Sequence, residues 1–167
     1  MALKSGQLAG LSVSEHTLAN ASRFLDGVQA DDGAAYGYQH PEVERTPTAI
    51  GLLCRMYSGW RRNEPRITRG VDLLSAWGPS YDDMYFNYYA TQVLHHAETP
   101  AWEAWNQRLR NHLVATQSLR GHETGSWHFA DYHTAPGGRL CDTALSLMIL
   151  EVYYRHLPLY GWKSVEF

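Results

Sequence analysis

The feature that most constrains this chain is a succession of six segments with helical apolar spacing, most of them closed by glycine or proline. Apolar residues recur every three or four positions in each segment, which is the period of an α-helix. A Thr-Pro pair opens two of the segments, and proline suits the first turn of a helix. The segments begin near Ser12, Thr46, Pro65, Ser80, Thr99 and Arg139, and they end near Gly33, Gly59, Gly78, Ala97, Leu119 and Pro158.

Two kinds of segment alternate along the chain. The first, third and fifth have one apolar stripe and a polar side, as at Ile67, Val71 and Leu74. The second and sixth are apolar on most faces, and the fourth is rich in tyrosine. Amphipathic helices face water on one side, whereas helices that are apolar all round are buried. We therefore predict an all-α fold of about three antiparallel helix hairpins, with outer amphipathic and inner apolar helices and no strand.

Composition narrows the functions that such a chain can have. The 167 residues suit one domain, here 1–167, and 44% of them are hydrophobic while 19% are charged. The net charge of −3 argues against nucleic acid as a partner, because that partner requires a dense basic face. No apolar run is long enough for a membrane span.

Three stretches of the sequence resemble one another in their aromatic and Gly positions, and two of them also share a Gln. The second stretch, 69–78, runs from Arg69-Gly70 through Leu73-Leu74 to Trp77-Gly78 and lacks the Gln. The residues that define the first and third stretches are Phe24, Gln29 and Gly33, followed by Tyr36, and then Gln117, Gly125 and Trp127. This pattern resembles the Gln-Trp repeats of squalene and oxidosqualene cyclases, which belong to the prenyltransferase and squalene-oxidase repeat family.

The resemblance implies an α/α toroid, in which the repeats stack side by side in a ring. Segment 144–160 also looks like the last inner helix of bacterial proteins that carry these repeats. A complete ring of this family holds about twice as many helices as this chain, and an open half ring would expose inner apolar surface. We expect the chain to be the C-terminal half of a larger toroid, or else to associate with a second copy.

The repeated Gln and Trp are expected to stabilise the stack rather than bind a ligand. A Gln such as Gln29 or Gln117 at the end of an outer helix can bond to backbone groups at the end of a neighbouring helix. An aromatic ring such as Trp127 can cover that amide. Buried polar groups usually have structural partners of this kind.

Acidic residues give only weak candidates for catalysis. Asp82 and Asp83 are the nearest match to the Asp-x-Asp-Asp acid of squalene-hopene-type cyclases, but the pattern would begin at Ser80. Carboxylates in the first turn of a helix stabilise it, which explains both residues without catalysis. The zinc-binding Asp and Cys of protein prenyltransferases lie two residues apart, whereas Cys141 and Asp142 are adjacent and reversed.

The loop between the fifth and sixth segments is rich in histidine. His122, His128 and His133, with Glu123 and Asp131 nearby, are residue types that hold zinc. Their spacing matches no helix face and no known zinc finger, so we predict neither a metal nor a cofactor.

The remaining candidates are aromatic and basic side chains that can line a groove at the ends of the inner helices. Aromatic walls suit an apolar or sugar-like ligand. The predicted lining residues are Tyr85, Tyr88, Tyr89, Trp127, His128, Tyr132 and Arg139.

Three functions remain open at this point. The first is a non-catalytic repeat module that binds a ligand or scaffolds a larger protein. The second is part of a terpene-cyclase or prenyltransferase-like enzyme that acts on an isoprenoid. The third is a carbohydrate-active toroid that pairs Glu42 or Glu44 with Asp131, since glycoside hydrolysis uses two carboxylates.

Overall fold

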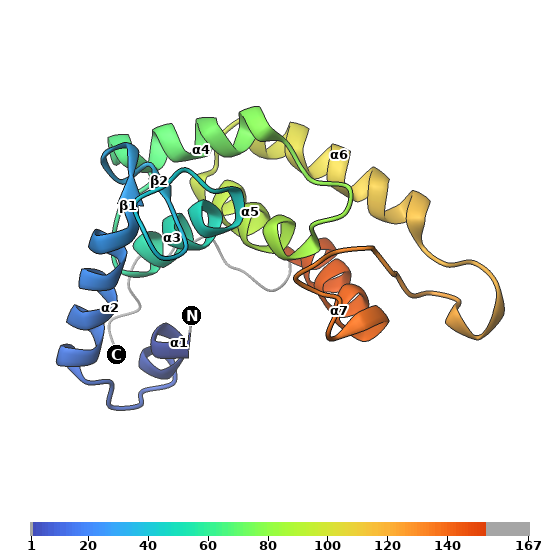
Figure 1. The fold of residues 1–167 in the computed structure, drawn as a ribbon, viewed down its shortest axis with the longest axis horizontal. Coiled ribbons are helices and arrows are strands. Elements are labelled where there is room, and N and C mark those ends of the chain that lie inside the picture. Colours follow the sequence, from blue (N-terminus) through green and yellow to red (C-terminus); the bar gives the residue numbers. More distant parts are fainter. Residues whose placement is uncertain (1, 153–167) are drawn as a thin grey trace. The chain divides into compact units, whose positions relative to one another are not determined.

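The computed structural model describes residues 2–152 and confirms the prediction of a mainly helical chain. It divides into two compact units, Met1–Gly70 (the N-terminal unit) and Val71–Phe167 (the C-terminal unit), and the boundary falls inside one helix. None of the described helices has both the length and the apolar character that a membrane span needs. The helices are α1 (Ala2–Leu8), α2 (Glu15–Val28), α3 (Arg45–Tyr57), α4 (Pro65–Trp77), α5 (Met84–Ala97), α6 (Ala101–Thr116) and α7 (Gly138–Leu150) (Figure 1).

The observed helix boundaries follow the predicted ones except near the N-terminus and at the start of α5. Helix α1 was not expected, and α2 begins at Glu15 with Ser14 in the N-cap position. The predicted capping box between Ser12 and Glu15 is therefore wrong. The end of the sixth segment at Pro158 lies outside the described residues.

A short antiparallel strand pair joins α2 to α3 in the N-terminal unit. Strands β1 (Gln29–Ala30) and β2 (Ala35–Tyr36) pair Gln29 with Tyr36 (Figure 1). A short 3₁₀ turn, Asp31–Gly33, closes the pair, and Gly33 adopts a positive φ of 84° that favours glycine. The prediction of no strand was wrong here, because two-residue strands are too short to show an alternating pattern.

Helix α3 forms the core of the N-terminal unit, as expected of a segment that is apolar on most faces. Eight of its residues are buried, whereas only Val28 is buried in α2. The close packing of α3 against β2 depends on Gly51, where an added Cβ would lie 2.4 Å from the Tyr36 ring. The amphipathic and apolar segments of this unit thus differ in burial as their patterns predicted.

One charged side chain lies inside this apolar packing. The Arg55 side chain is only 3% exposed, and its guanidinium pairs with Asp26 at 2.5 Å. It also donates to the Tyr36 hydroxyl oxygen at 3.1 Å and lies over the Trp60 ring. Buried charges need such partners, because an unpaired charge loses its solvation. The apolar pattern of segment 46–59 gave no sign of this network.

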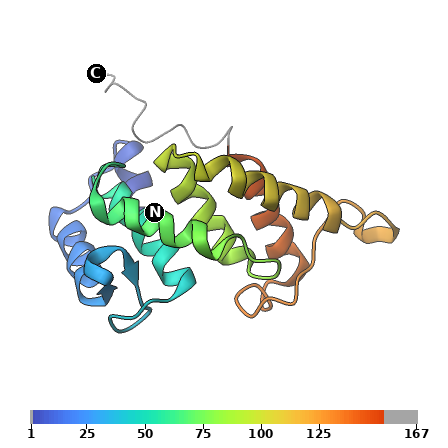
Figure 2. The same ribbon diagram turned by 90° about the horizontal axis from the view of Figure 1, so that it is seen from above.

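In the C-terminal unit, α5 packs against both α6 and α7 (Figure 2). Helix α5 buries polar as well as apolar residues, among them Asn87, Gln92 and His96. Thr91 accepts a hydrogen bond of 3.0 Å from the indole nitrogen of Trp105, which lies on α6. These contacts make α5 the central helix of its unit.

The same hydrogen-bond arrangement links the beginning of α3, α5 and α7 to the segment before each helix. One side chain of each helix accepts from the backbone N–H of an upstream residue and donates to the carbonyl oxygen of that same residue. We call this arrangement the backbone clasp. The three clasps are Tyr36 with Thr48 (3.0 and 3.2 Å), Ser80 with Asn87 (2.9 and 2.8 Å) and Trp127 with Thr143 (3.1 and 3.3 Å).

Candidate functional site

The best-defined polar cluster in the C-terminal unit lies where segment 127–133 meets the N-terminal ends of α5 and α7. Asp131 accepts from the backbone N–H of Met84, the first residue of α5, at 3.2 Å. Asp142 in the first turns of α7 accepts from the N–H of Phe129 at 2.8 Å. Two buried carboxylates therefore fasten one loop segment to two helices.

Asp83 begins α5 instead of lying inside its first turn. Its Oδ1 accepts from the N–H of Phe86 at 2.7 Å, which makes it the N-cap residue. Asp82 precedes it and accepts from the Ser80 hydroxyl at 2.7 Å. The predicted helix start near Ser80 is thus corrected to Met84, and Asp83 occupies the position where carboxylates stabilise a helix most directly.

His133 lies between two carboxylates. Its Nδ1 is 3.5 Å from Asp131 Oδ1 and 3.8 Å from Asp83 Oδ2. The Asp131 side chain is 3% exposed, and its Oδ1 also accepts from the backbone N–H of His133 at 2.8 Å. Asp83 lies in a predicted helix and Asp131 in a predicted loop, so the sequence did not predict that the two carboxylates are close in space.

A second histidine is held by a second buried carboxylate. His128 Nδ1 lies 3.2 Å from Asp142 Oδ2, and the Asp142 side chain is 1% exposed. The other oxygen, Oδ1, has no hydrogen-bond partner in the described part of the chain. A carboxylate on one ring nitrogen fixes the orientation of an imidazole, and the half-exposed ring of His128 is directed by Asp142 in this way.

The predicted tyrosines gather next to His133. Tyr85 stacks on the His133 ring with centroids 5.8 Å apart, and Tyr89 meets Tyr85 edge-on at 5.0 Å. Tyr88 contacts Tyr89, and Tyr132, which is 89% exposed, lies edge-on to His133. The four tyrosines of the predicted groove therefore form one aromatic group around an Asp-His cluster.

Trp127 and Arg139 do not join this wall. The Trp127 ring is buried, and its Nε1 donates to the Leu113 carbonyl of α6 at 2.7 Å. Arg139 pairs with Glu123 at 2.7 Å and donates to Ser126. Both side chains hold the loop between α6 and α7 in place, so the structure separates them from the tyrosine group.

The repeated Gln side chains bond within their own hairpins or to a neighbouring side chain. Gln117 donates to the Gly125 carbonyl at 3.0 Å, and the Gln29 side-chain oxygen accepts from Arg55 at 3.4 Å. The expected bond to the backbone of a neighbouring helix end is therefore wrong for the described contacts. Phe24, another residue of the repeat, is largely exposed. The helix-end contact comes instead from Trp127.

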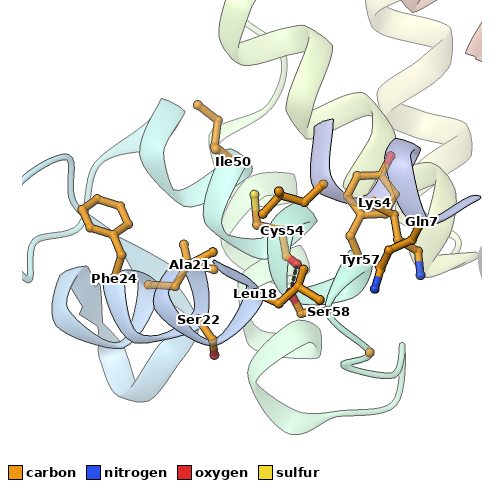
Figure 3. A pocket seen from close by; sticks show the side chains of 13 residues that line it. Lys4, Gln7, Leu18, Ala21, Ser22, Phe24, Ile50, Cys54, Tyr57 and Ser58 are labelled. Carbon is orange, nitrogen blue, oxygen red and sulfur yellow. Dashed lines mark hydrogen bonds between the residues drawn. The ribbon is translucent and has the colours of Figure 1, made fainter. Parts of the chain in front are cut away.

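An open groove of about 720 Å³ lies within the N-terminal unit, between α1, α2 and α3 (Figure 3). Burial raises the pKa of the Cys54 thiol that borders it, so this cysteine is a poor nucleophile near neutral pH. Phe24, a predicted structural residue of the repeat, lies on its wall, and none of the predicted binding residues does. The lining is mainly apolar and consists of Leu3, Lys4, Gln7, Leu18, Ala21, Ser22, Phe24, Leu25, Ile50, Cys54, Tyr57, Ser58 and Gly59.

Two of the three carboxylates proposed for carbohydrate chemistry, Glu44 and Asp131, accept hydrogen bonds from nearby backbone groups. Glu44 accepts from the backbone N–H of Tyr38 at 2.8 Å, and Glu42 is exposed. Asp131 is occupied by two backbone N–H groups. None of the three lines the groove of the N-terminal unit.

Sequence reasoning missed Asp142 as an anchor of the loop. A single acidic residue inside an otherwise apolar segment was the available signal, since a carboxylate is rarely buried without partners.

No family model, no curated protein and no solved structure matches this chain.

Proposed function

We propose that this chain is a repeat module of the terpene-cyclase and prenyltransferase kind, forming part of an α/α toroid that binds or scaffolds without catalysing isoprenoid chemistry. The pairs α2–α3, α4–α5 and α6–α7 would be its three consecutive repeats. The observation that carries this proposal is the backbone clasp, which recurs at the start of the second helix of each pair.

The clasp supports a repeat because the same pair of hydrogen bonds is made by threonine in two of the helix pairs and by asparagine in the third. Thr48 and Thr143 use one hydroxyl as both acceptor and donor, whereas Asn87 uses its amide oxygen and nitrogen. The clasp side chain lies in the first two turns of each helix, and a shared role near the start of three helices is expected of diverged copies of one unit.

The hairpins before α3 and α7 add a second resemblance. Each follows an outer helix that ends at a Gln, and each contains a glycine with positive φ, 84° at Gly33 and 87° at Gly125. Each then leads to a buried aromatic residue, Tyr36 or Trp127, which the clasp holds. These shared features agree with repeats of the kind that the sequence resembles.

The non-catalytic part of the proposal depends on what the acidic residues already do. The Oδ1 of Asp83 caps α5, and Asp82 accepts from Ser80. A cyclase acid must deliver its proton to a bound substrate in an enclosed site. The groove that the structure describes lies in the N-terminal unit and includes neither residue.

The proposal is tested by incubating the purified chain with squalene, farnesyl diphosphate and geranylgeranyl diphosphate, followed by mass spectrometry of the extracts. We expect no product beyond a protein-free control. A cyclised or transferred product that disappears in Asp83→Asn would overturn the non-catalytic assignment and favour the enzyme alternative. Light scattering on the same sample tests association, because a second copy completing the ring doubles the 19.0 kDa mass.

A further inference from the structure

Three potential metal ligands from separate parts of the C-terminal unit meet at one point. One carboxylate oxygen of Asp83, one of Asp131 and the Nδ1 of His133 all lie within 4.8 Å of one another. Asp83 comes from the start of α5, and the other two come from the loop before α7. The set combines oxygen and imidazole donors, which is the mixture that zinc accepts.

The separations fit ligands of one ion better than they fit direct hydrogen bonds. His133 Nδ1 is 3.5 Å from Asp131 Oδ1 and 3.8 Å from Asp83 Oδ2. A nitrogen–oxygen hydrogen bond is about 2.7–3.2 Å long. Two ligands at about 2.0–2.1 Å from a tetrahedral zinc ion lie roughly 3.3–3.4 Å apart. The third separation, between the carboxylate oxygens of Asp83 and Asp131, is within 4.8 Å, so the three atoms reach coordination distance when the cluster contracts around an ion.

The carboxylates are already held in position by backbone groups. Asp83 Oδ1 accepts from the N–H of Phe86, and its Oδ2 lies 3.8 Å from His133 Nδ1. Asp131 Oδ2 accepts from the N–H of Met84, and its Oδ1 accepts from the N–H of His133 and lies 3.5 Å from the imidazole nitrogen. Hydrogen bonds from backbone groups orient metal ligands in this way.

Charge gives an independent reason for a cation at this place. The Asp131 side chain is 3% exposed and accepts from the backbone N–H groups of Met84 and His133, which stabilise its charge but do not neutralise it. In the described part of the chain, its one ion-pair partner is His133, whose charge depends on protonation. A divalent ion would compensate both carboxylates and leave His133 neutral, which is the form that binds metals.

We propose that Asp83, Asp131 and His133 bind one zinc-class divalent ion, with water in the remaining coordination position. The His133 side chain is 44% exposed, so an ion reaches the cluster from solvent. Tyr85 stacks on the imidazole from one side and limits its rotation. This proposal does not depend on the repeat assignment, because all three ligands belong to one compact unit.

The test is calorimetric titration of the chelator-treated chain with zinc chloride. We expect one ion per chain, and we expect magnesium chloride to bind far more weakly, because magnesium prefers oxygen ligands. His133→Gln and Asp83→Asn should each weaken zinc binding by on the order of tenfold or more. The matched control is His128→Gln, which removes a similarly exposed histidine from the same loop but not from the cluster.

Circular dichroism confirms that each variant keeps its helices, and cobalt chloride gives a second readout through the strong visible absorption of four-coordinate cobalt. Asp131→Asn, which keeps one of the two oxygens that accept from the backbone N–H groups of Met84 and His133, should also lose this absorption, and circular dichroism shows whether it keeps its helices. The proposal is overturned if the wild-type chain shows no saturable zinc binding. It is also overturned if His133→Gln binds zinc as tightly as wild type, or if His128→Gln loses as much affinity.

Discussion

Replacing Asn87 by alanine tests the backbone clasp at a buried position. Asn87 is fully buried, and Ser80, whose backbone it binds, is also buried. The amide accepts from the Ser80 N–H at 2.9 Å and donates to the Ser80 carbonyl at 2.8 Å. Alanine removes both partners at once and leaves a buried donor and a buried acceptor without hydrogen bonds.

The size of the effect follows from these two groups. A buried polar group that loses its partner costs about 1–3 kcal/mol, so the pair costs about 2–6 kcal/mol. Water that enters the space left by the amide reduces this cost, and we expect about 2–4 kcal/mol for Asn87→Ala. Domains of ordinary stability have about 5–15 kcal/mol to lose, so the variant should fold but unfold at clearly lower urea concentration.

The measurement is urea unfolding followed by far-ultraviolet circular dichroism. Asn111→Ala, at an exposed position of α6, is the matched control and should change the free energy of unfolding by less than about 0.5 kcal/mol. Asn87→Asp keeps the acceptor for the Ser80 N–H but places a carboxylate oxygen against the carbonyl, so it should also destabilise. Equal unfolding curves for Asn87→Ala and Asn111→Ala would refute the view that the clasp stabilises the fold.

Two further predictions concern the N-terminal unit. Burial, with a smaller contribution from Asp26, raises the pKa of Tyr36 even though Arg55 lowers it. The folded chain therefore keeps a proton that the unfolded chain releases above about pH 10, and the free energy of unfolding falls as pH rises beyond that point. Urea midpoints between about pH 8 and pH 11 should show this decline in wild type, and a Tyr36→Phe variant that retains the full decline would contradict the assignment. Gly51→Ala should destabilise by about 1–3 kcal/mol, because its Cβ would lie 2.4 Å from the Tyr36 ring. Gly27→Ala in α2, where an added Cβ meets nothing within 4 Å, should instead stabilise by about 0.5–1 kcal/mol, and thermal melts in which both variants shift in the same direction would count against this packing.

Local signals predicted most of the helices because the physics of helix ends is local. Pro65 begins α4 and Gly78 follows it, as proline and glycine at those positions indicated. The contrast between α2 and α3 was also predictable, since the apolar pattern states which faces are buried. The strand pair and α1 were missed, because neither segment is long enough to carry a periodic pattern.

The candidate site was only partly predictable because it depends on contacts between distant residues. Tyr85 and Tyr132 do lie together, but Trp127 is buried beneath the loop instead of lining a wall. Asp83 and Asp131 approach the same histidine although they lie far apart in the sequence. Their convergence follows from how the loop before α7 reaches the start of α5, and no spacing rule within one segment encodes that.

The clasp affects which insertions the segments before α3, α5 and α7 can tolerate. Its partners are 12 residues apart at Thr48, 7 at Asn87 and 16 at Thr143, yet α3, α5 and α7 are each secured in the same way. The connecting segment can therefore lengthen or acquire new side chains without shifting the helix that follows it. Asp131 and His133 lie inside the longest of these connections, the one with the most room for additional side chains.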